Sequence, residues 1–231
     1  MFVLEPPAVT SIPVADSNDV FAVRRIYCVG RNYAAHVREM GFEPSRESPF
    51  FFCKPTDAVV AVKAGEKGQI AYPPKTGSFH YEIELVAAIG TGGRDIPVEE
   101  ANDHIWGYAV GLDMTRRDIQ IAARDKGRPW EVGKSFDQSA PVGPLYPSSK
   151  VGHPSRGLIF LDVNGKSHQK SDLENLIWSV PEIVSNLSSF FELMPGDLIM
   201  TGTPDGVGPV VRGDLMRGGI DGLGELLVEV N

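Results

Sequence analysis

The clearest alternation of hydrophobic and polar positions in the chain lies within residues 79–90. Apolar residues alternate there with Glu82 and Glu84, and the three apolar positions are Tyr81, Ile83 and Leu85. Alternation is typical of a β-strand, because neighbouring side chains of a strand point to opposite faces. The pattern predicts one strand over Phe79–Gly90 that carries both carboxylates on the same face.

Shorter apolar runs, separated by glycine and proline, predict many further strands. They lie at residues 25–29, 50–54, 58–62, 68–74, 105–114, 198–201, 214–216 and 225–230, and residues 158–168 form a hairpin around Asn164-Gly165. Helical patterns cover residues 32–40, 97–103 and 115–126. The many short strands and few helices predict a mainly β fold of the α+β class, and no Gly-x-Gly-x-x-Gly supports a dinucleotide-binding sheet.

One more helix is expected after the capping box Ser179-Val180-Pro181-Glu182. In a capping box the first and fourth residues satisfy each other's free backbone N–H groups at a helix start. The apolar stripe of this helix is predicted to be buried, and its members are Ile183, Leu187, Phe190 and Phe191. We expect the helix to be structural.

The length of 231 residues and a hydrophobic fraction of 42% fit one large domain with its own core. We expect residues 1–24 to form strands and turns packed on a main domain of residues 25–231. A net charge of −8 argues against nucleic acid as a partner. Without a long apolar run or a signal-like start, we expect a cytoplasmic protein that has no membrane contact. Cys28 and Cys53 are expected to be buried, reduced thiols.

The paired carboxylates of Glu82 and Glu84 indicate a candidate cation site. Two like charges side by side repel unless a cation lies between them, and oxygen ligands favour Mg²⁺, Mn²⁺ or Ca²⁺. Asp113, at the end of the predicted strand 105–114, is a candidate third ligand. Two plainer alternatives are a solvated acidic face on an edge strand, and Asp113 as the cap of the helix that begins at Thr115.

His36 and Glu39 stand three residues apart on a predicted helix and therefore share a face. Such a pair has the form of a general base and its orienting carboxylate, although a surface ion pair has the same spacing. Lys134, in a loop of small and apolar residues, could stabilise an oxyanion or could simply be solvated. The turn at residues 201–208 could hold a carboxylate or be only a tight connection.

Five ordered sequence blocks together resemble the signature of the fumarylacetoacetate hydrolase family. They are Gly30–His36, Tyr81–Leu85, Gly111–Gln120, Lys134–Asp137 with Gly143-Pro144, and Thr201–Gly208. Each block alone is weak, but five in the right order are specific. The resemblance extends from about Arg25 to the C-terminus and is strongest to the short branch of the family, which includes fumarylpyruvate hydrolases and other acylpyruvases.

The resemblance implies a mixed β-sandwich roll of the fumarylacetoacetate hydrolase C-terminal-domain type, usually assembled as a homodimer. It implies Mg²⁺ or Mn²⁺ at the carboxylates, a water-activating dyad, an oxyanion-stabilising lysine and substrate contacts. The corresponding residues are Glu82, Glu84 and Asp113 for the metal, His36 with Glu39 for the dyad, Lys134 for the oxyanion, and Gln120 and Thr203 for the substrate.

The expected reaction is metal-dependent hydrolysis of a carbon–carbon bond in a 2,4-diketo acid, above all fumarylpyruvate to fumarate and pyruvate in aromatic degradation. Alternatives are an oxaloacetate decarboxylase with the same metal site, a general acylpyruvase, and a metal-binding module without catalysis. A second carboxylate on the substrate calls for an arginine. The candidates are Arg31, Arg46, Arg116, Arg117 and Arg124, of which Arg31 is taken as the substrate contact, and the loop 41–49 is a candidate lid.

Overall fold

The fold is built on a large mixed sheet with a second sheet packed against it. The computed structural model describes residues 1–43 and 46–231. Along the large sheet, neighbouring strands are β4 (Phe50–Lys54), β3 (Arg25–Gly30), β15 (Asp197–Met200), β8 (Ile83–Ile89), β9 (Ile105–Leu112), β11 (Ala140–Val142) and β5 (Val59–Ala61), with β12 (Tyr146–Pro147) also paired to β9. Strand β8 therefore lies at the centre of this sheet.

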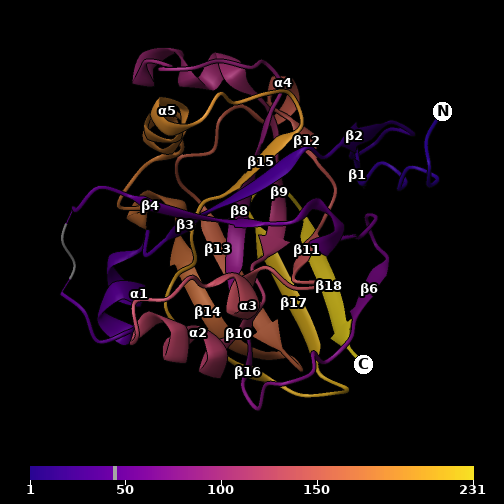
Figure 1. The fold of residues 1–231 in the computed structure, drawn as a ribbon. Helices are drawn as coiled ribbons and strands as arrows, with labels where there is room; N and C mark the ends of the chain where they lie inside the picture. The colour runs from indigo at the N-terminus through magenta and orange to yellow at the C-terminus, as the bar shows by residue number, and fades with distance from the viewer. Residues whose placement is uncertain (44–45) are drawn as a thin grey trace.

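The second sheet has five strands and comes mainly from the C-terminal part of the chain (Figure 1). Its order is β14 (Lys166–Asp172), β13 (Leu158–Val163), β17 (Leu215–Ile220), β18 (Glu225–Val230) and β6 (Lys67–Ile70). A three-stranded sheet contains β10 (Thr115–Arg116), β7 (Phe79–Tyr81) and β16 (Gly208–Val210), and β1 (Ser11–Pro13) pairs with β2 (Val20–Ala22). These sheets enclose the core, and the large sheet positions Glu82, Glu84 and Asp113 at and beside β8 and β9.

Strand β8 is buried on both faces. Ile83 and Leu85 belong to the core cluster that includes Leu161 of β13, whereas Val86 packs with Met200 in a second cluster behind the sheet. Full burial of one such side chain contributes about 1.5–3 kcal/mol. The close packing on Ile83 depends on Gly218, because a Cβ there would lie 2.4 Å from Ile83 Cδ1.

The helices are short and lie outside the sheets. They are α1 (Ala34–Glu39), α2 (Arg117–Arg124), α3 (Glu131–Lys134), α4 (Ser148–Val151) and α5 (Val180–Phe190), with 3-10 turns η1 (Thr56–Ala58), η2 (Val98–His104) and η3 (Leu173–Asn175). Figure 1 places α1 and α2 at the lower left and α4 and α5 at the top. Among the described residues, no helix has the length and apolar character needed to cross a membrane.

Several expectations from the sequence are confirmed. The fold is mainly β with few helices. The hairpin turns at Asn164 and Gly165, whose φ angles of 51° and 76° are those of a tight two-residue turn. The capping box is present at the start of α5, where the Ser179 N–H donates to the Glu182 carboxylate at 2.9 Å.

Other expectations are wrong in detail. The strand predicted over residues 79–90 is broken at Glu82, because β7 and β8 belong to different sheets. Phe190 is 65% exposed and Phe191 38%, since both lie at the end of α5 where the helix leaves the core. Cys53 is exposed on the outer strand pair, while Cys28 is buried. The predicted lid 41–49 includes Pro44 and Ser45, which lie outside the described residues.

Candidate active site

The register of β8 and β9 brings three carboxylates together. Glu84 pairs with Gly111 across the two strands, and the Asp113 N–H donates to the Glu82 carbonyl at 2.9 Å. Residues directly opposite in an antiparallel pair place their side chains on the same face, and residues two apart on one strand do so as well. Glu82, Glu84 and Asp113 therefore share a face. Gly111, opposite Glu84, lets Val86 pack closely, because a Cβ there would lie 2.6 Å from Val86 Cγ2.

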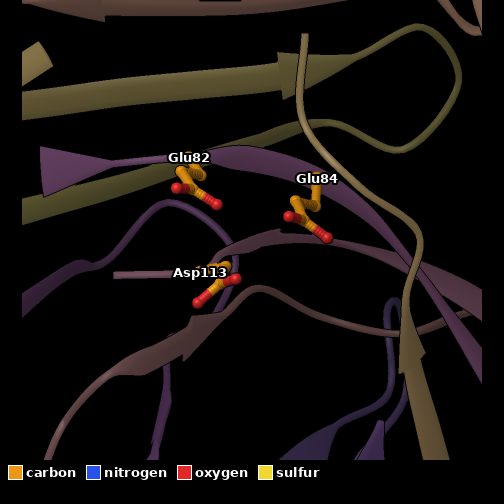
Figure 2. Close-up of side chains that lie close together, drawn as sticks. All are labelled: Glu82, Glu84 and Asp113. Atoms are coloured by element: carbon orange, nitrogen blue, oxygen red, sulfur yellow. The ribbon is translucent and has the colours of Figure 1, made fainter. Parts of the chain in front are cut away.

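The carboxylates turn toward one another in a buried space (Figure 2). One oxygen from each lies within 4.8 Å of the others. Glu82 is 5% exposed, Glu84 2% and Asp113 1%, so the solvated acidic face weighed from the sequence is wrong. The helix-cap alternative for Asp113 is also wrong, because α2 begins at Arg117 without a side-chain cap.

Three buried cations surround these carboxylates. The Lys134 Nζ lies 2.8 Å from Glu82 Oε2 and 2.7 Å from Asp113 Oδ2, so the solvated alternative for Lys134 is wrong. The Lys54 Nζ lies 2.8 Å from Asp113 Oδ1, and Arg117 pairs with Glu82. Burial alone would lower the pKa of Lys134, but the charges of Asp113 and Glu82 raise it, so its ammonium group stays charged.

Glu84 differs from the other two carboxylates because no cation of the described chain pairs with it. It accepts the Gly202 N–H at 2.7 Å. Burial, followed by the charges of Asp113 and Glu82, raises the pKa of Glu84 well above its ordinary value. In contrast, Lys134 and Arg117 overcome the effect of burial on Glu82 and lower its pKa. A divalent cation between the three oxygens would give the Glu84 carboxylate the positive partner that it lacks. The residues therefore fit a hard metal ion.

His36 and Glu39 meet at the same cavity. The His36 Nδ1 lies 3.1 Å from Glu39 Oε2, and the Gly206 N–H donates to Glu39 Oε1 at 3.0 Å. Burial would raise the pKa of Glu39, but hydrogen bonds from His36 and from the amides of Gly206 and Val207 hold it below its ordinary value. His36 is 7% exposed whereas Glu39 is exposed, so the pair reaches from the cavity to the surface and has the geometry of a base with its orienting carboxylate.

The predicted substrate contacts Arg31, Gln120 and Thr203 line the same cavity as the carboxylates, His36 and Lys134. Gln120 accepts a hydrogen bond from Arg117 Nη1 at 3.3 Å. The Thr203 hydroxyl accepts from Gln169 Nε2 at 2.9 Å, which fixes the 201–208 turn against the sheet. Eight of the nine predicted site residues therefore line this cavity. The ninth, Glu39, contacts it through His36.

The cavity around the carboxylates has a volume of about 40 Å³, which holds a few water molecules. A second cavity of about 410 Å³ lies next to it, and Gly30, Arg31 and Phe50 line both. The larger volume is within the ~300–1,000 Å³ of small-molecule sites. A ligand of several carbons anchored at the carboxylates would therefore extend toward the second cavity.

Sequence reasoning missed two buried residues of the site, Lys54 and Gln169. Lys54 donates to the carbonyls of Met114 and Lys134 as well as approaching Asp113. Gln169 is fully buried and accepts the Ile83 N–H at 3.0 Å, so it ties the start of β8 to Thr203. The one available signal was a lysine that directly ends the apolar run Phe50–Cys53; Gln169 lies in a polar stretch without any signal.

Comparison with known proteins gives the family. A protein-family model, described as fumarylacetoacetate (FAA) hydrolase C-terminal, matches residues 25–231. The chain belongs to the fumarylacetoacetate hydrolase family. The predicted resemblance and fold class are thereby confirmed, and the mainly β architecture is that of the family's C-terminal domain.

Similar proteins include fumarylpyruvate hydrolases and an oxaloacetate tautomerase. The structure of fumarylpyruvate hydrolase from Pseudomonas aeruginosa, in complex with Mn²⁺ and pyruvate, has a TM-score of 0.98 and 64% identity over 100% of this chain and 99% of that chain. Fumarylpyruvate hydrolase from a Ralstonia species is 45% identical over 188 residues, covering 81% of this chain and 95% of the relative. A mitochondrial oxaloacetate tautomerase from Arabidopsis thaliana is 42% identical over 206 residues, covering 89% and 90%.

Proposed function

We propose that this member of the fumarylacetoacetate hydrolase family is a metal-dependent hydrolase that cleaves fumarylpyruvate to fumarate and pyruvate. The observation that carries the proposal is the buried triad Glu82, Glu84 and Asp113 beside the His36–Glu39 pair. The fumarylpyruvate hydrolase similar to this chain at a TM-score of 0.98 supports it, since that protein holds Mn²⁺ and pyruvate. The reaction agrees with the one expected from the sequence.

The triad would hold the metal ion, for which we propose Mg²⁺, with Mn²⁺ or Ca²⁺ as alternatives, through carboxylate oxygens. When bound, such an ion acts as a Lewis acid and as a template for neighbouring oxygen atoms of a substrate. Lys54, Lys134 and Arg117 hold the first and third carboxylates in place. Glu84 remains the carboxylate with the greatest need for an added positive charge.

Hydrolysis requires a base that takes a proton from water. In the neutral tautomer that donates from Nδ1 to Glu39, His36 keeps Nε2 free to accept this proton. The hydroxide attacks the C4 carbonyl of the diketo acid, and the C3–C4 bond breaks with its electron pair on the pyruvate part. Protonated His36 returns the proton to C3, so water is consumed and one acid and one pyruvate are formed.

The pyruvate part leaves with negative charge, which a buried cation can stabilise. The Lys134 ammonium group is held at the centre of the site by Glu82 and Asp113 and remains charged. Positioned charges of this kind are often the largest single term in catalysis. We propose that Lys134 stabilises the leaving group and that Gln120, Thr203 and Arg31, which line the cavity, contact the substrate.

Oxaloacetate chemistry is the second candidate, because a relative of similar identity is named oxaloacetate tautomerase. Decarboxylation or tautomerisation of oxaloacetate would use the metal site but needs no attacking water. The His36–Glu39 pair, fixed by Gly206, favours hydrolysis. A general acylpyruvase would share the whole mechanism and differ only in the acyl group accepted.

The test compares substrates on one enzyme preparation with Mg²⁺. Fumarylpyruvate, acetylpyruvate and oxaloacetate are followed by loss of enol absorbance, with products separated by chromatography. We expect the highest kcat/KM for fumarylpyruvate, with one fumarate and one pyruvate per turnover. Fast conversion of oxaloacetate without hydrolysis of either acylpyruvate would instead support the oxaloacetate activity.

Four further expectations from the sequence stay predictions. We propose a homodimer, which sedimentation would test. We also propose that the protein is cytoplasmic and that it acts in aromatic degradation. The division into residues 1–24 and 25–231 is consistent with a family match that begins at residue 25, but truncation at residue 24 is the direct test.

A further inference from the structure

Two arginines line the active-site cavity away from the carboxylates. Arg31 and Arg124 both contribute to its wall, and they flank the ring of Phe42. The Arg31 Cζ lies 3.8 Å from the ring centroid and the Arg124 Cζ lies 5.6 Å from it. Arg31 also approaches Phe50, at 5.7 Å from Cζ to the ring centroid. The two guanidinium groups thus meet at an aromatic wall.

The Arg31 guanidinium has no hydrogen bond or ion pair to any residue that the structure describes. Burial, followed by the charge of Arg124, lowers the pKa of Arg31. Arg124 is held by the carboxylate of Asp125, with 2.9 Å between Nε and Oδ1. Two half-buried cations that lie over the same ring repel each other, and an anion bound by both relieves that repulsion. Stacked arginines of this kind are suited to bidentate recognition of a carboxylate.

The other candidate arginines are already engaged. Arg117 pairs with Glu82 inside the catalytic cluster. Arg46 pairs with Glu182 and stacks on Trp178 at 4.5 Å. Arg116 donates to the Val132 carbonyl at 3.2 Å and stacks on Phe136, and it lines neither cavity. Of the five arginines weighed from the sequence, Arg31 and Arg124 line the cavity outside the catalytic cluster. Arg124 is paired only with its chain neighbour Asp125, and Arg31 has no hydrogen bond or ion pair within the described residues.

The position of Arg31 matches the far end of an extended substrate, and Arg124 lines the smaller cavity. Arg31 and Phe50 line both the small cavity at the carboxylates and the larger cavity next to it. Glu43 and Glu47 line the larger cavity as well, and Glu47 raises the pKa of Arg31 slightly against the other effects. Both glutamates are exposed, so water screens their repulsion of an anion more than it screens the half-buried arginines.

We infer that Arg31 and Arg124 form a subsite for the distal carboxylate of the acyl group, so that the enzyme selects diketo acids with a second carboxylate. This inference rests on the proposed acylpyruvate hydrolysis and specifies its substrate class. The Phe42 ring packs against both guanidinium groups, and the metal-binding end of the substrate would lie at the triad. Acyl groups that end in a methyl group would leave the two arginines without an anion.

The test measures kcat/KM of Arg31→Met and Arg124→Met for fumarylpyruvate and for acetylpyruvate, whose acyl group has no carboxylate. Loss of one charge-assisted hydrogen bond predicts a decrease of about 10–100-fold for fumarylpyruvate and less than about 3-fold for acetylpyruvate. Arg46→Met is the matched control, because its guanidinium is engaged by Glu182 and Trp178. We expect Arg46→Met to keep the wild-type ratio of kcat/KM for fumarylpyruvate to kcat/KM for acetylpyruvate. An equal decrease for both substrates in the Arg31 and Arg124 variants would overturn the subsite.

A binding measurement separates this inference from the proposed function. Fumarate and crotonate share an unsaturated four-carbon chain, but crotonate has a methyl group where fumarate has its second carboxylate. Calorimetry with the Mg²⁺-loaded protein should give tighter binding of fumarate, and Arg31→Met should remove this preference. If neither acylpyruvate is hydrolysed but the preference depends on Arg31, the function fails and the subsite stands. Equal affinities in the wild type would reject the subsite even if fumarylpyruvate is hydrolysed.

Discussion

Lys54 holds Asp113 in place from a fully enclosed position. Its Nζ lies 2.8 Å from Asp113 Oδ1, and its side chain is 0% exposed. Breaking a buried ion pair costs about 3–5 kcal/mol. Here the change would leave Asp113 with Lys134 as its remaining cation, and would remove the Lys54 donor from the buried Met114 and Lys134 carbonyls. Lys54→Met should therefore lower the free energy of unfolding by about that amount in urea, and should weaken Mg²⁺ binding by about 10–100-fold.

The matched control for Lys54 is an exposed ion pair. Lys67 lies 2.6 Å from Glu229, with 47% of the lysine side chain exposed. Surface pairs contribute about 0–1 kcal/mol, so Lys67→Met should change stability little and leave metal affinity unchanged. Equal stability and equal metal affinity of the two variants would show that Lys54 has no positioning role.

Glu39 gives a prediction that depends on pH. The pKa of Glu39 is lower in the folded protein than its ordinary value of 4.5. The ionised carboxylate therefore stabilises the fold above pH 4.5, and this contribution is lost as the pH falls through the pKa of the folded state. Glu39→Gln should decrease kcat by about 10²-fold or more, because the base loses its anionic partner. At pH 7 the variant should have a lower free energy of unfolding than the wild type, and this difference should shrink as the pH approaches 4. A deficit that grows on acidification would contradict the lowered pKa.

Residue types at the site were predictable where they carry their own chemical signal. The pairs Glu82 with Glu84 and His36 with Glu39 could be read from spacing alone, because period two and a helical turn set which side chains share a face. Lys54 and Arg117 could not, since their partners are far away in sequence and lysine or arginine alone indicates no burial. Distal contacts of this kind depend on the sheet register.

At the scale of elements, the turn after β15 connects the base to the sheet. Gly206 has a φ of 90°, and a Cβ there would lie 2.0 Å from the carbonyl oxygen of His168. Gly206→Ala should displace the amide that binds Glu39 and decrease kcat/KM by about 10²-fold, the effect of a misplacement near 1 Å. Steady-state kinetics with fumarylpyruvate checks this.

Gly213→Ala is the control for that prediction. Gly213 has a φ of 89°, so alanine meets the same cost of a left-handed backbone, but nothing lies within 4 Å of the added Cβ. Both variants should lose similar stability from the backbone, and only Gly206→Ala should lose activity. Equal activity in the two variants would show that the turn does not position Glu39.

Most elements could be predicted from the sequence, but the break at Glu82 could not. The alternation of residues 79–90 continues through Glu82, whereas the backbone leaves one sheet and enters another there. Local periodicity reports which face a side chain occupies and carries no information about the strand with which it pairs. The prediction therefore placed both carboxylates correctly on one face, and gave the wrong number of strands.

At the scale of the whole molecule, metal binding should be coupled to stability. A ligand at 100 times its dissociation constant stabilises the native state by about 2.7 kcal/mol, which for 231 residues raises Tm by about 5–10 °C. Calorimetry with Mg²⁺ and with a chelator should detect this shift. Glu84→Gln should abolish it, and Glu66→Gln, a change in an exposed residue, should preserve it. A full shift in Glu84→Gln would remove Glu84 from the metal site.

The order of strands in the large sheet was beyond the reach of the sequence. Strand β3 pairs with β15, which follows it by about 170 residues, and β5 pairs in parallel with β11. Such pairings join segments far apart in the chain and leave no mark in local periodicity. The family resemblance, carried by five short blocks, supplied the type of fold but no strand order.

The most direct test of the account is the origin of the oxygen in the acid product. Fumarylpyruvate is converted in H₂¹⁸O with Mg²⁺, and the fumarate is analysed by mass spectrometry, with Glu84→Gln and chelated enzyme as controls. The account predicts one ¹⁸O in each fumarate formed by the wild type and no turnover in either control. Undiminished turnover after chelation, or fumarate without ¹⁸O, would contradict metal-dependent attack of water at C4.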